Sequence, residues 1–151
     1  MAVPAAGVLE AITDPALRAI VICPSNPYLS VDPILAVSGI ALALSTATAP
    51  VIAVSPIIGG QAVKGPTAKI MTELGIAVST KAIDAHYRGL IDGLVIDEAD
   101  AADRESVDLP VLVRHTLIRD IADREQLARD VIAFADSLRH QSADKCMAGH
   151  R

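Results

Sequence analysis

Residues 33–63 contain no charged side chain. A stretch of this length without charge must be buried, either in a lipid bilayer or in the core of a folded domain. About 20 uncharged residues can span a bilayer, so a membrane helix over residues 34–54 is one interpretation. Polar residues at 45–48 and then Pro50 interrupt the stretch, however, and no cluster of Lys or Arg flanks it. We therefore expect two short buried elements and no membrane span.

Strand, polar loop and helix follow one another along the first half of the chain. Residues 19–23 are apolar and β-branched, which predicts a buried strand, and Pro24 ends it because proline has no N–H for the ladder. Asp32-Pro33 is typical of a helix start, with an N-cap before a proline, and this helix should run to about Leu44. Residues 51–55 predict a second buried strand. Together these elements form a strand–helix–strand unit.

The remaining predicted elements are short, apart from a final amphipathic helix. We expect helices over residues 5–12, 66–74 and 79–90, and strands over residues 94–97 and 111–115. Gly75 should end the second of these helices, and Ser79 should cap the third. Asp123 with Gln126 predicts a capping box for the last helix. One face of that helix is apolar and should pack on the sheet, through Leu127, Ala128, Val131, Ile132, Ala135 and Leu138.

The core of this chain must be built mainly from small aliphatic side chains. Hydrophobic residues make up 52% of the 151 residues, and mean hydropathy is +0.44, but aromatic residues make up only 2%. This composition favours a parallel sheet buried under helices, because strands of such sheets are continuous runs of Val, Ile and Leu. We expect one α/β domain with a mainly parallel sheet over residues 1–139, followed by a polar tail at 140–151 that frays.

The distribution of charge and cysteine restricts the partners and the compartment. Thirteen Lys and Arg oppose 18 Asp and Glu, which gives a net charge of −5 without a basic run, so no nucleic-acid partner is expected. Tyr28, Tyr87 and Phe134 are too scattered to form a stacking platform for bases. Cys23 and Cys146 match no metal-binding spacing or disulfide framework, and Cys23 should be a small buried hydrophobe. Since no signal peptide is visible, we expect a reducing cytoplasm.

Two polar loops follow the first two predicted strands. Residues 24–31 form the first, and residues 55–65 form the second, in which Gly59, Gly60 and Gly65 surround Lys64. Because parallel strands end at the same edge of a sheet, both loops should open there, with backbone N–H groups and helix starts that suit a phosphate or diphosphate. The pattern differs from that of a P-loop. The alternative is that the glycines only form turns and Lys64 is solvated.

Other side chains that could bind a metal or act in catalysis have less specific sequence patterns. Four aspartates could suggest a metal cluster, but their spacing matches no calcium loop, and a solvated acidic segment is the favoured interpretation for Asp92, Asp97, Asp100 and Asp103. His86 lies in a predicted helix and His115 at the end of a predicted strand. Neither has an evident nucleophile or metal partner, so we expect structural or surface roles for both.

The two loops carry a family resemblance. Residues 22–35 (ICPSNPYLSVDPIL) and 54–66 (VSPIIGGQAVKGP) resemble the second half of the 2-phospho-L-lactate transferase family, which makes the deazaflavin coenzyme F-420. The resemblance covers about residues 5–138 and implies a doubly wound, Rossmann-like α/β sheet, of which this chain would be a partial copy. It also implies transfer of a phosphorylated three-carbon acid, of the 2-phospholactate or phosphoenolpyruvate type, from a guanylyl-diphosphate donor to the deazaflavin Fo, with release of GMP.

The resemblance also implies a site and a cofactor. It assigns a donor and phosphate region to Pro24, Ser25, Asn26, Pro27, Ser30, Ser55, Gly59, Gly60, Lys64 and Gly65, and it identifies no catalytic base. The family's Mg²⁺ ligands and Gly-rich loop belong to an earlier half, and nothing in this chain replaces them. We therefore expect a homo-oligomer or a complementing amino-terminal half, and no activity from this chain alone. The alternative is a non-enzymatic nucleotide- or phosphate-binding regulator on the same fold.

Overall fold

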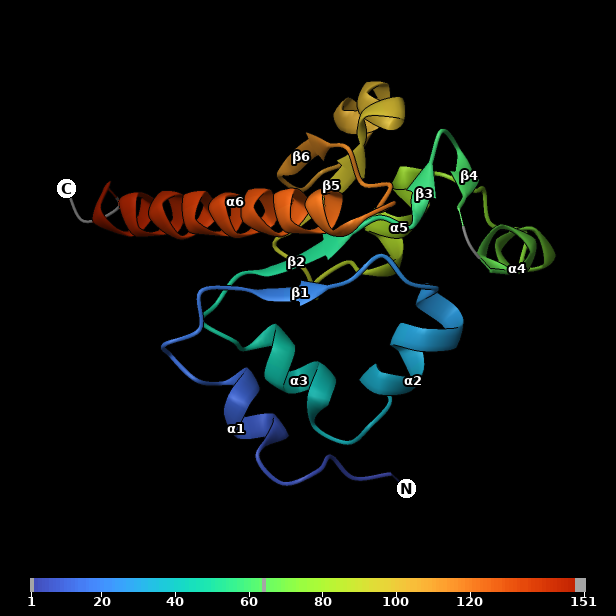
Figure 1. Ribbon diagram of the computed structural model, residues 1–151. Helices are drawn as coiled ribbons and strands as arrows, with labels where there is room; N and C mark the ends of the chain where they lie inside the picture. Colours follow the sequence, from blue (N-terminus) through green and yellow to red (C-terminus); the bar gives the residue numbers. More distant parts are fainter. Residues whose placement is uncertain (1, 64, 149–151) are drawn as a thin grey trace.

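The computed structural model describes residues 2–63 and 65–148, with residues 141–148 described as backbone alone. In this part of the chain, four strands form a parallel sheet in the order β1-β2-β5-β6 (Figure 1). They are β1 (Ile20–Ile22), β2 (Val51–Val54), β5 (Gly93–Asp97) and β6 (Val111–Arg114). Ile52 of β2 is in register with Val21 of β1 and with Gly93 of β5. The predicted parallel α/β sheet is confirmed.

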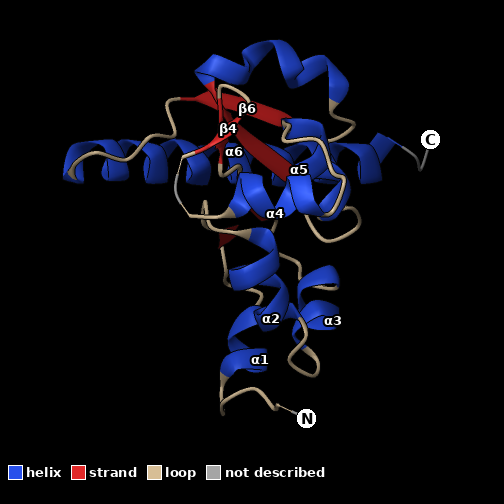
Figure 2. Cartoon of the chain, turned by 90° about the vertical axis from the view of Figure 1, so that its right-hand side faces the viewer, coloured by secondary structure: helices blue, strands red, loops and turns tan. Residues whose placement is uncertain are grey.

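Helices cover both faces of this sheet. On one face, α6 (Ile121–Ala148) packs Leu127, Val131, Ala135 and Leu138 against Ile52, Val54 and Val95. Alternate residues of the same strands point to the other face, where they form the larger core with residues from α3 (Ile40–Ser45) and α5 (Thr80–His86). Figure 2 shows α3 on that side together with α1 (Val8–Ile12) and α2 (Asp32–Leu35). The doubly wound arrangement implied by the resemblance is confirmed.

The helix predicted from Pro33 to about Leu44 is wrong, because the chain forms two helices there, α2 and α3. Gly39 separates them with a φ of +86°, a conformation that favours glycine, and a Cβ at this position would lie 3.3 Å from Cδ1 of Leu9. The break therefore lies at a residue that both the backbone conformation and the nearby Leu9 side chain favour as glycine. The candidate membrane segment at 34–54 is divided among α2, α3 and β2, and no helix in the described ranges is both long and apolar enough to cross a bilayer.

Both polar loops contain regular structure of their own. The first folds into a π-helical turn, η1 (Pro27–Val31), which leads directly into α2, so Asn26 and not Asp32 is the N-cap. The second begins with a small antiparallel hairpin, β3 (Ile57–Ile58) and β4 (Gln61–Ala62), and continues to α4 (Thr67–Glu73). Helix α5 is capped as predicted, since Oγ of Ser79 accepts a hydrogen bond from the N–H of Ala82 at 3.2 Å, although α5 ends at His86, before Leu90.

The start of α6 differs from the predicted capping box. Asp120 is the cap, because its Oδ1 accepts a hydrogen bond from the N–H of Asp123 at 2.9 Å. Asp123 is then free to accept hydrogen bonds on Oδ2 from the N–H and Nε of Arg119. Nη2 of Arg119 lies 3.2 Å from Nε2 of His115. Of the predicted apolar face, four residues are buried, Ile132 is partly buried and Ala128 is exposed. Helix α6 continues to Ala148, beyond residue 139, where the sequence predicted that a polar tail begins.

Candidate functional site

The carboxyl ends of the parallel strands meet at one edge of the sheet, and a cavity of about 460 Å³ opens there. The loop after β1, the loop after β2 and the segment after β6 all line it. The lining residues are Pro24, Ser25, Asn26, Leu29, Ser30, Ser55, Pro56, Ile58, Val63, Gly65, Pro66, Thr67, Thr116, Leu117 and Ile118. The prediction that the two polar loops share the carboxyl edge is confirmed.

Asn26 organises the first loop. Its Oδ1 accepts hydrogen bonds from the backbone N–H groups of Tyr28 and Leu29, both at 3.0 Å. Because only the amide oxygen can accept these bonds, they fix the orientation of the amide group and leave Nδ2 for another partner. The loop is therefore a capped turn of defined shape at the end of β1.

Ser55 and Asp97 form the buried middle of this edge. Ser55 is 2% exposed, and its Oγ accepts the N–H of Ile57 at 3.1 Å. Asp97 accepts the N–H of Thr116 at 2.8 Å and the hydroxyl of Thr116 at 3.1 Å, and also the N–H of Ala99 at 3.0 Å. Burial raises the pKa of Asp97, but the hydrogen bonds from Ala99 and Thr116 outweigh burial, so the pKa lies below its usual value. Asp97 is thus a carboxylate that holds Thr116 in the cavity wall.

Asp100, in the 3-10 helix η2 (Glu98–Ser106), is buried as well. Its two carboxylate oxygens accept the N–H groups of Gly59 and Gly60, each at 2.8 Å. These bonds tie the turn of the β3–β4 hairpin to η2, so both glycine N–H groups already have acceptors. The prediction of a solvated acidic segment is wrong for Asp97 and Asp100, because both are buried and each accepts at least one backbone N–H from a distant part of the chain.

His86 contacts the first loop and the helix that follows it. Its Nε2 lies 2.9 Å from Oδ1 of Asp32 in α2, and its ring makes edge-on contacts with the rings of Tyr28 and Tyr87 at centroid distances of 4.9 and 5.0 Å. Burial, together with the charge of Asp32, raises the pKa of both tyrosines. These contacts connect η1 and α2 to α5, which agrees with the structural role expected for His86.

Residues 1–135 match the family described as 2-phospho-L-lactate transferase CofD. The chain belongs to this family. The 2-phospho-L-lactate transferase of Methanocaldococcus jannaschii is 39% identical over 119 residues, which are 79% of this chain and 38% of the relative. The phosphoenolpyruvate transferase of Kitasatospora aureofaciens is 39% identical over 143 residues, which are 92% of this chain and 44% of the relative. The chain therefore spans about two-fifths of the length of the curated relatives it matches.

Most of the residues that the resemblance to the 2-phospho-L-lactate transferase family assigned to the site lie together at the cavity. Those that line it are Pro24, Ser25, Asn26, Ser30, Ser55 and Gly65. Pro27 is buried within η1 instead, and Gly59 and Gly60 form the hairpin turn that Asp100 holds. Lys64 lies outside the described residues.

The described residues do not fit the Mg²⁺ site that the family implies. No group of three or more His, Cys, Asp and Glu side chains in the described ranges could hold a metal ion. Asp97 and Asp100 are the buried carboxylates of this edge, and both oxygens of each already accept hydrogen bonds from backbone N–H groups. No magnesium ligand and no metal-dependent step are therefore assigned to the described part of this chain.

Sequence reasoning missed the third wall of the cavity, Thr116 to Ile118. The signal was present, because residues 111–115 were predicted as a strand and the carboxyl end of every parallel strand contributes to the same edge. Thr67 was also missed as a lining residue, because it lies in the helix predicted over residues 66–74 and no motif marked it as part of a site. Leu29 and Ile118, which are 60% and 39% exposed, add an apolar rim that polar motifs could not indicate.

Proposed function

We propose that this chain forms part of a transferase of coenzyme F-420 biosynthesis. In this reaction, a phosphorylated three-carbon acid of the 2-phospholactate or phosphoenolpyruvate type moves from a guanylyl-diphosphate donor to the alcohol of the deazaflavin Fo, and GMP is released. The observation that carries the proposal is that both loops with family-specific sequence line one cavity at the carboxyl edge of the sheet. The names of the relatives, 2-phospho-L-lactate transferase and phosphoenolpyruvate transferase, support the class of acid.

The donor and its phosphates occupy the two loops in this proposal. The residues that we assign to them are Pro24, Ser25, Asn26, Pro27, Ser30, Ser55, Gly59, Gly60, Lys64 and Gly65. Of these, Asn26 and Ser55 offer side-chain donors at the cavity, whereas Pro27, Gly59 and Gly60 shape the loops behind it. The contribution of this chain is to position the diphosphate for in-line attack, since orientation alone can lower a barrier substantially.

The same proposal includes the partners and the cofactor of the family. Mg²⁺, where bound, would offset charge on a diphosphate. We place its ligands in the amino-terminal half of the family. As partners of this chain we propose a complementing amino-terminal half or further copies of the chain in a homo-oligomer. The cytoplasm is the proposed compartment. The alternative on this fold is a regulator that binds a nucleotide or phosphate without chemistry.

The test is to purify the chain and measure GMP release and formation of the coenzyme precursor with the donor, Fo and Mg²⁺. Two arms are compared, one with the chain alone and one with a polypeptide that covers the amino-terminal half of the relatives. We expect turnover only in the second arm. Turnover in the first arm would show that this chain holds its own metal site. Nucleotide binding without turnover in either arm would support the regulator.

A further inference from the structure

The turn η1 separates two depressions of the protein surface. On one side, Leu29 and Ser30 line the cavity at the carboxyl edge of the sheet. On the other side, Tyr28 lines a second depression of about 480 Å³, together with His86 and other residues of α5 and of the segment before it. Contacts that hold Tyr28 in the second depression therefore also determine where Leu29 and Ser30 lie in the first.

Every backbone N–H from residue 28 to residue 32 is bonded within this turn. The first two donate to Oδ1 of Asn26, the next two donate to the backbone oxygen of Asn26 at 3.0 and 3.3 Å, and the last donates to the oxygen of Pro27. These five amides exchange with solvent only when the turn opens, so they report directly on how firmly it is held.

His86 holds η1 from a distant part of the chain. Its Nε2 lies 2.9 Å from Oδ1 of Asp32, and its ring makes an edge-on contact with the ring of Tyr28. A carboxylate can only accept, so Nε2 carries the hydrogen of this bond. The side chain of His86 is 19% exposed and lines the second depression, through which protons can reach it.

Protonation would strengthen the contact between His86 and Asp32. Histidine side chains change their charge between about pH 5 and 8, and a proton on Nδ1 would turn this hydrogen bond into an ion pair. Asp32 favours the charge, whereas Lys81, a cation that lines the same depression, opposes it. Tyr28 and Tyr87 stay neutral, because burial raises the pKa of both.

We infer that His86 is a positioning residue for the cavity and that its protonation sets how firmly η1 is held. The protonated ring binds Asp32 more strongly, so η1 opens less often and keeps Leu29 and Ser30 in the cavity wall. Ligand affinity at the cavity should then increase as the pH falls from about 8 to about 5.5. This inference rests on the proposed function and deepens it, because it adds a form of regulation to the same site.

The chain offers closely matched variants for a test. His86→Gln keeps an N–H donor near the position of Nε2 but cannot be protonated, whereas His86→Phe keeps a ring and loses the donor. Asp32→Asn keeps an acceptor oxygen and loses the charge. The control is His140→Gln, because His140 is an exposed residue of α6, which packs on the opposite face of the sheet.

The first measurement is amide hydrogen exchange of residues 28–32 without ligand, expressed as protection factors at about pH 8 and about pH 5.5. We expect protection in the parent and in His140→Gln to rise about threefold at the lower pH, the size of effect that a partly exposed ion pair gives. His86→Gln and Asp32→Asn should show no such rise. His86→Phe should lower protection by about threefold to tenfold at both pH values.

The second measurement is calorimetric titration with GDP at the same two pH values. Because GDP itself titrates, each affinity is divided by that of His86→Gln at the same pH, and this ratio should grow about threefold for the parent at the lower pH. Equal protection profiles of the parent and His86→Gln would overturn the inference, and so would a pH response of the turn without one in GDP affinity. If no variant binds GDP while exchange behaves as expected, the role of His86 is supported and the guanylyl donor of the proposed function is wrong. The Gln and Asn variants carry the test if His86→Phe does not fold.

Discussion

Asp97 joins the end of β5 to the segment after β6 through hydrogen bonds to its carboxylate. Because its pKa is below that of an unfolded aspartate, its charged form stabilises the fold above about pH 4. This contribution is lost as the pH falls through the lower, folded-state pKa. We expect Asp97→Asn to lower the free energy of unfolding at pH 7 by about 1–3 kcal/mol. The free energy of unfolding of this variant should also fall less between pH 7 and pH 3 than that of the parent. Urea titrations from pH 7 down to pH 3 measure both, and parallel pH profiles would contradict the role of this carboxylate.

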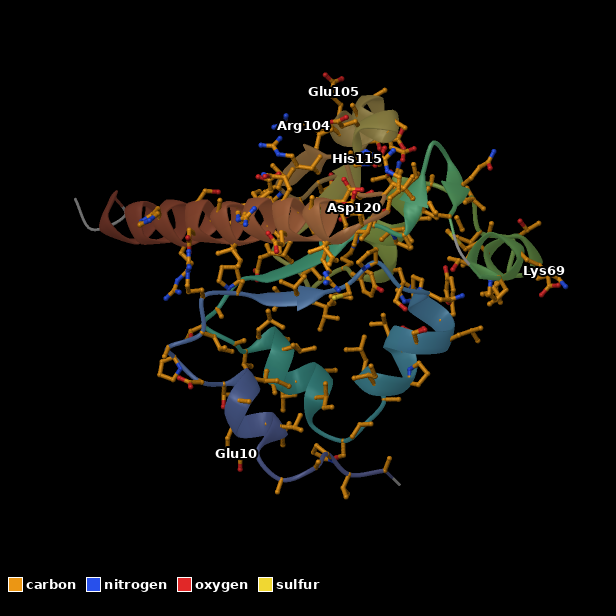
Figure 3. All side chains as sticks on the ribbon, viewed as in Figure 1. Glu10, Lys69, Arg104, Glu105, His115 and Asp120 are labelled. Carbon is orange, nitrogen blue, oxygen red and sulfur yellow. The ribbon has the colours of Figure 1, made fainter. Side chains whose placement is uncertain are left out.

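Lys64 remains a prediction from sequence, because it lies outside the described residues. If it contacts the diphosphate, Lys64→Ala should weaken binding of GDP or pyrophosphate by about 1.5–3 kcal/mol, the value of a charge-assisted hydrogen bond. The control is Lys69→Ala. Lys69 belongs to α4 and pairs with Glu73 at 3.8 Å, and Figure 3 shows it on the outer side of that helix. Equal affinities for both variants in calorimetry would make Lys64 an ordinary surface lysine.

The contact between α6 and the sheet depends on a missing side chain at Gly93. A Cβ at this position would lie 2.7 Å from Cε1 of Phe134 and 3.0 Å from Cδ1 of Leu138. Gly93→Ala should therefore overpack this interface and lower the free energy of unfolding by about 1–3 kcal/mol. Adding Phe134→Leu should recover part of the loss, since it removes ring atoms that the new methyl group meets. Urea unfolding of the single and double variants tests this, and a stable Gly93→Ala would show that α6 can shift.

Asp100 holds the turn of the β3–β4 hairpin, whose own ladder is short. Asp100→Ala would leave the N–H groups of Gly59 and Gly60 without acceptors. This change should lower the free energy of unfolding by about 1–3 kcal/mol. We expect faster amide hydrogen exchange in residues 57–62 and a looser second wall of the cavity. Asp103→Ala, in the same 3-10 helix, is the control and should leave exchange in the hairpin unchanged. Equal exchange in both variants would mean that other contacts position the hairpin.

At the scale of the whole molecule, β1 lies at one edge of the described sheet, and this edge bears on self-association. In the described sheet, β1 pairs only with β2, and Val21 is 40% exposed while Cys23 is exposed as well, contrary to the expectation of a buried cysteine. An unpaired apolar edge favours association with another chain. We expect sedimentation velocity to show self-association that increases with concentration and that Val21→Lys reduces. A parent chain that stays monomeric at all concentrations would contradict this prediction.

The positions of the strands and the class of fold could be predicted from the sequence alone. Short β-branched runs bounded by proline, glycine or polar residues favour buried strands, and the Ser79 cap acts within one turn of helix. Such patterns are local, so the sequence contains them completely. The family followed from the two loops for the same reason, since their motifs are contiguous.

Only the tertiary structure decided which residues meet. Gly39 divides a predicted helix at a left-handed φ, where Leu9 of another helix lies close, and Asp100 is buried against a hairpin some 40 residues earlier that supplies its donors. Thr67 is an ordinary helical residue until the loops that surround it close the cavity. The physical reason is that burial and pairing depend on atoms distant in the chain, whereas propensity depends on neighbours in sequence. The sequence thus determined the elements and the family, and packing determined the chemistry of the cavity wall.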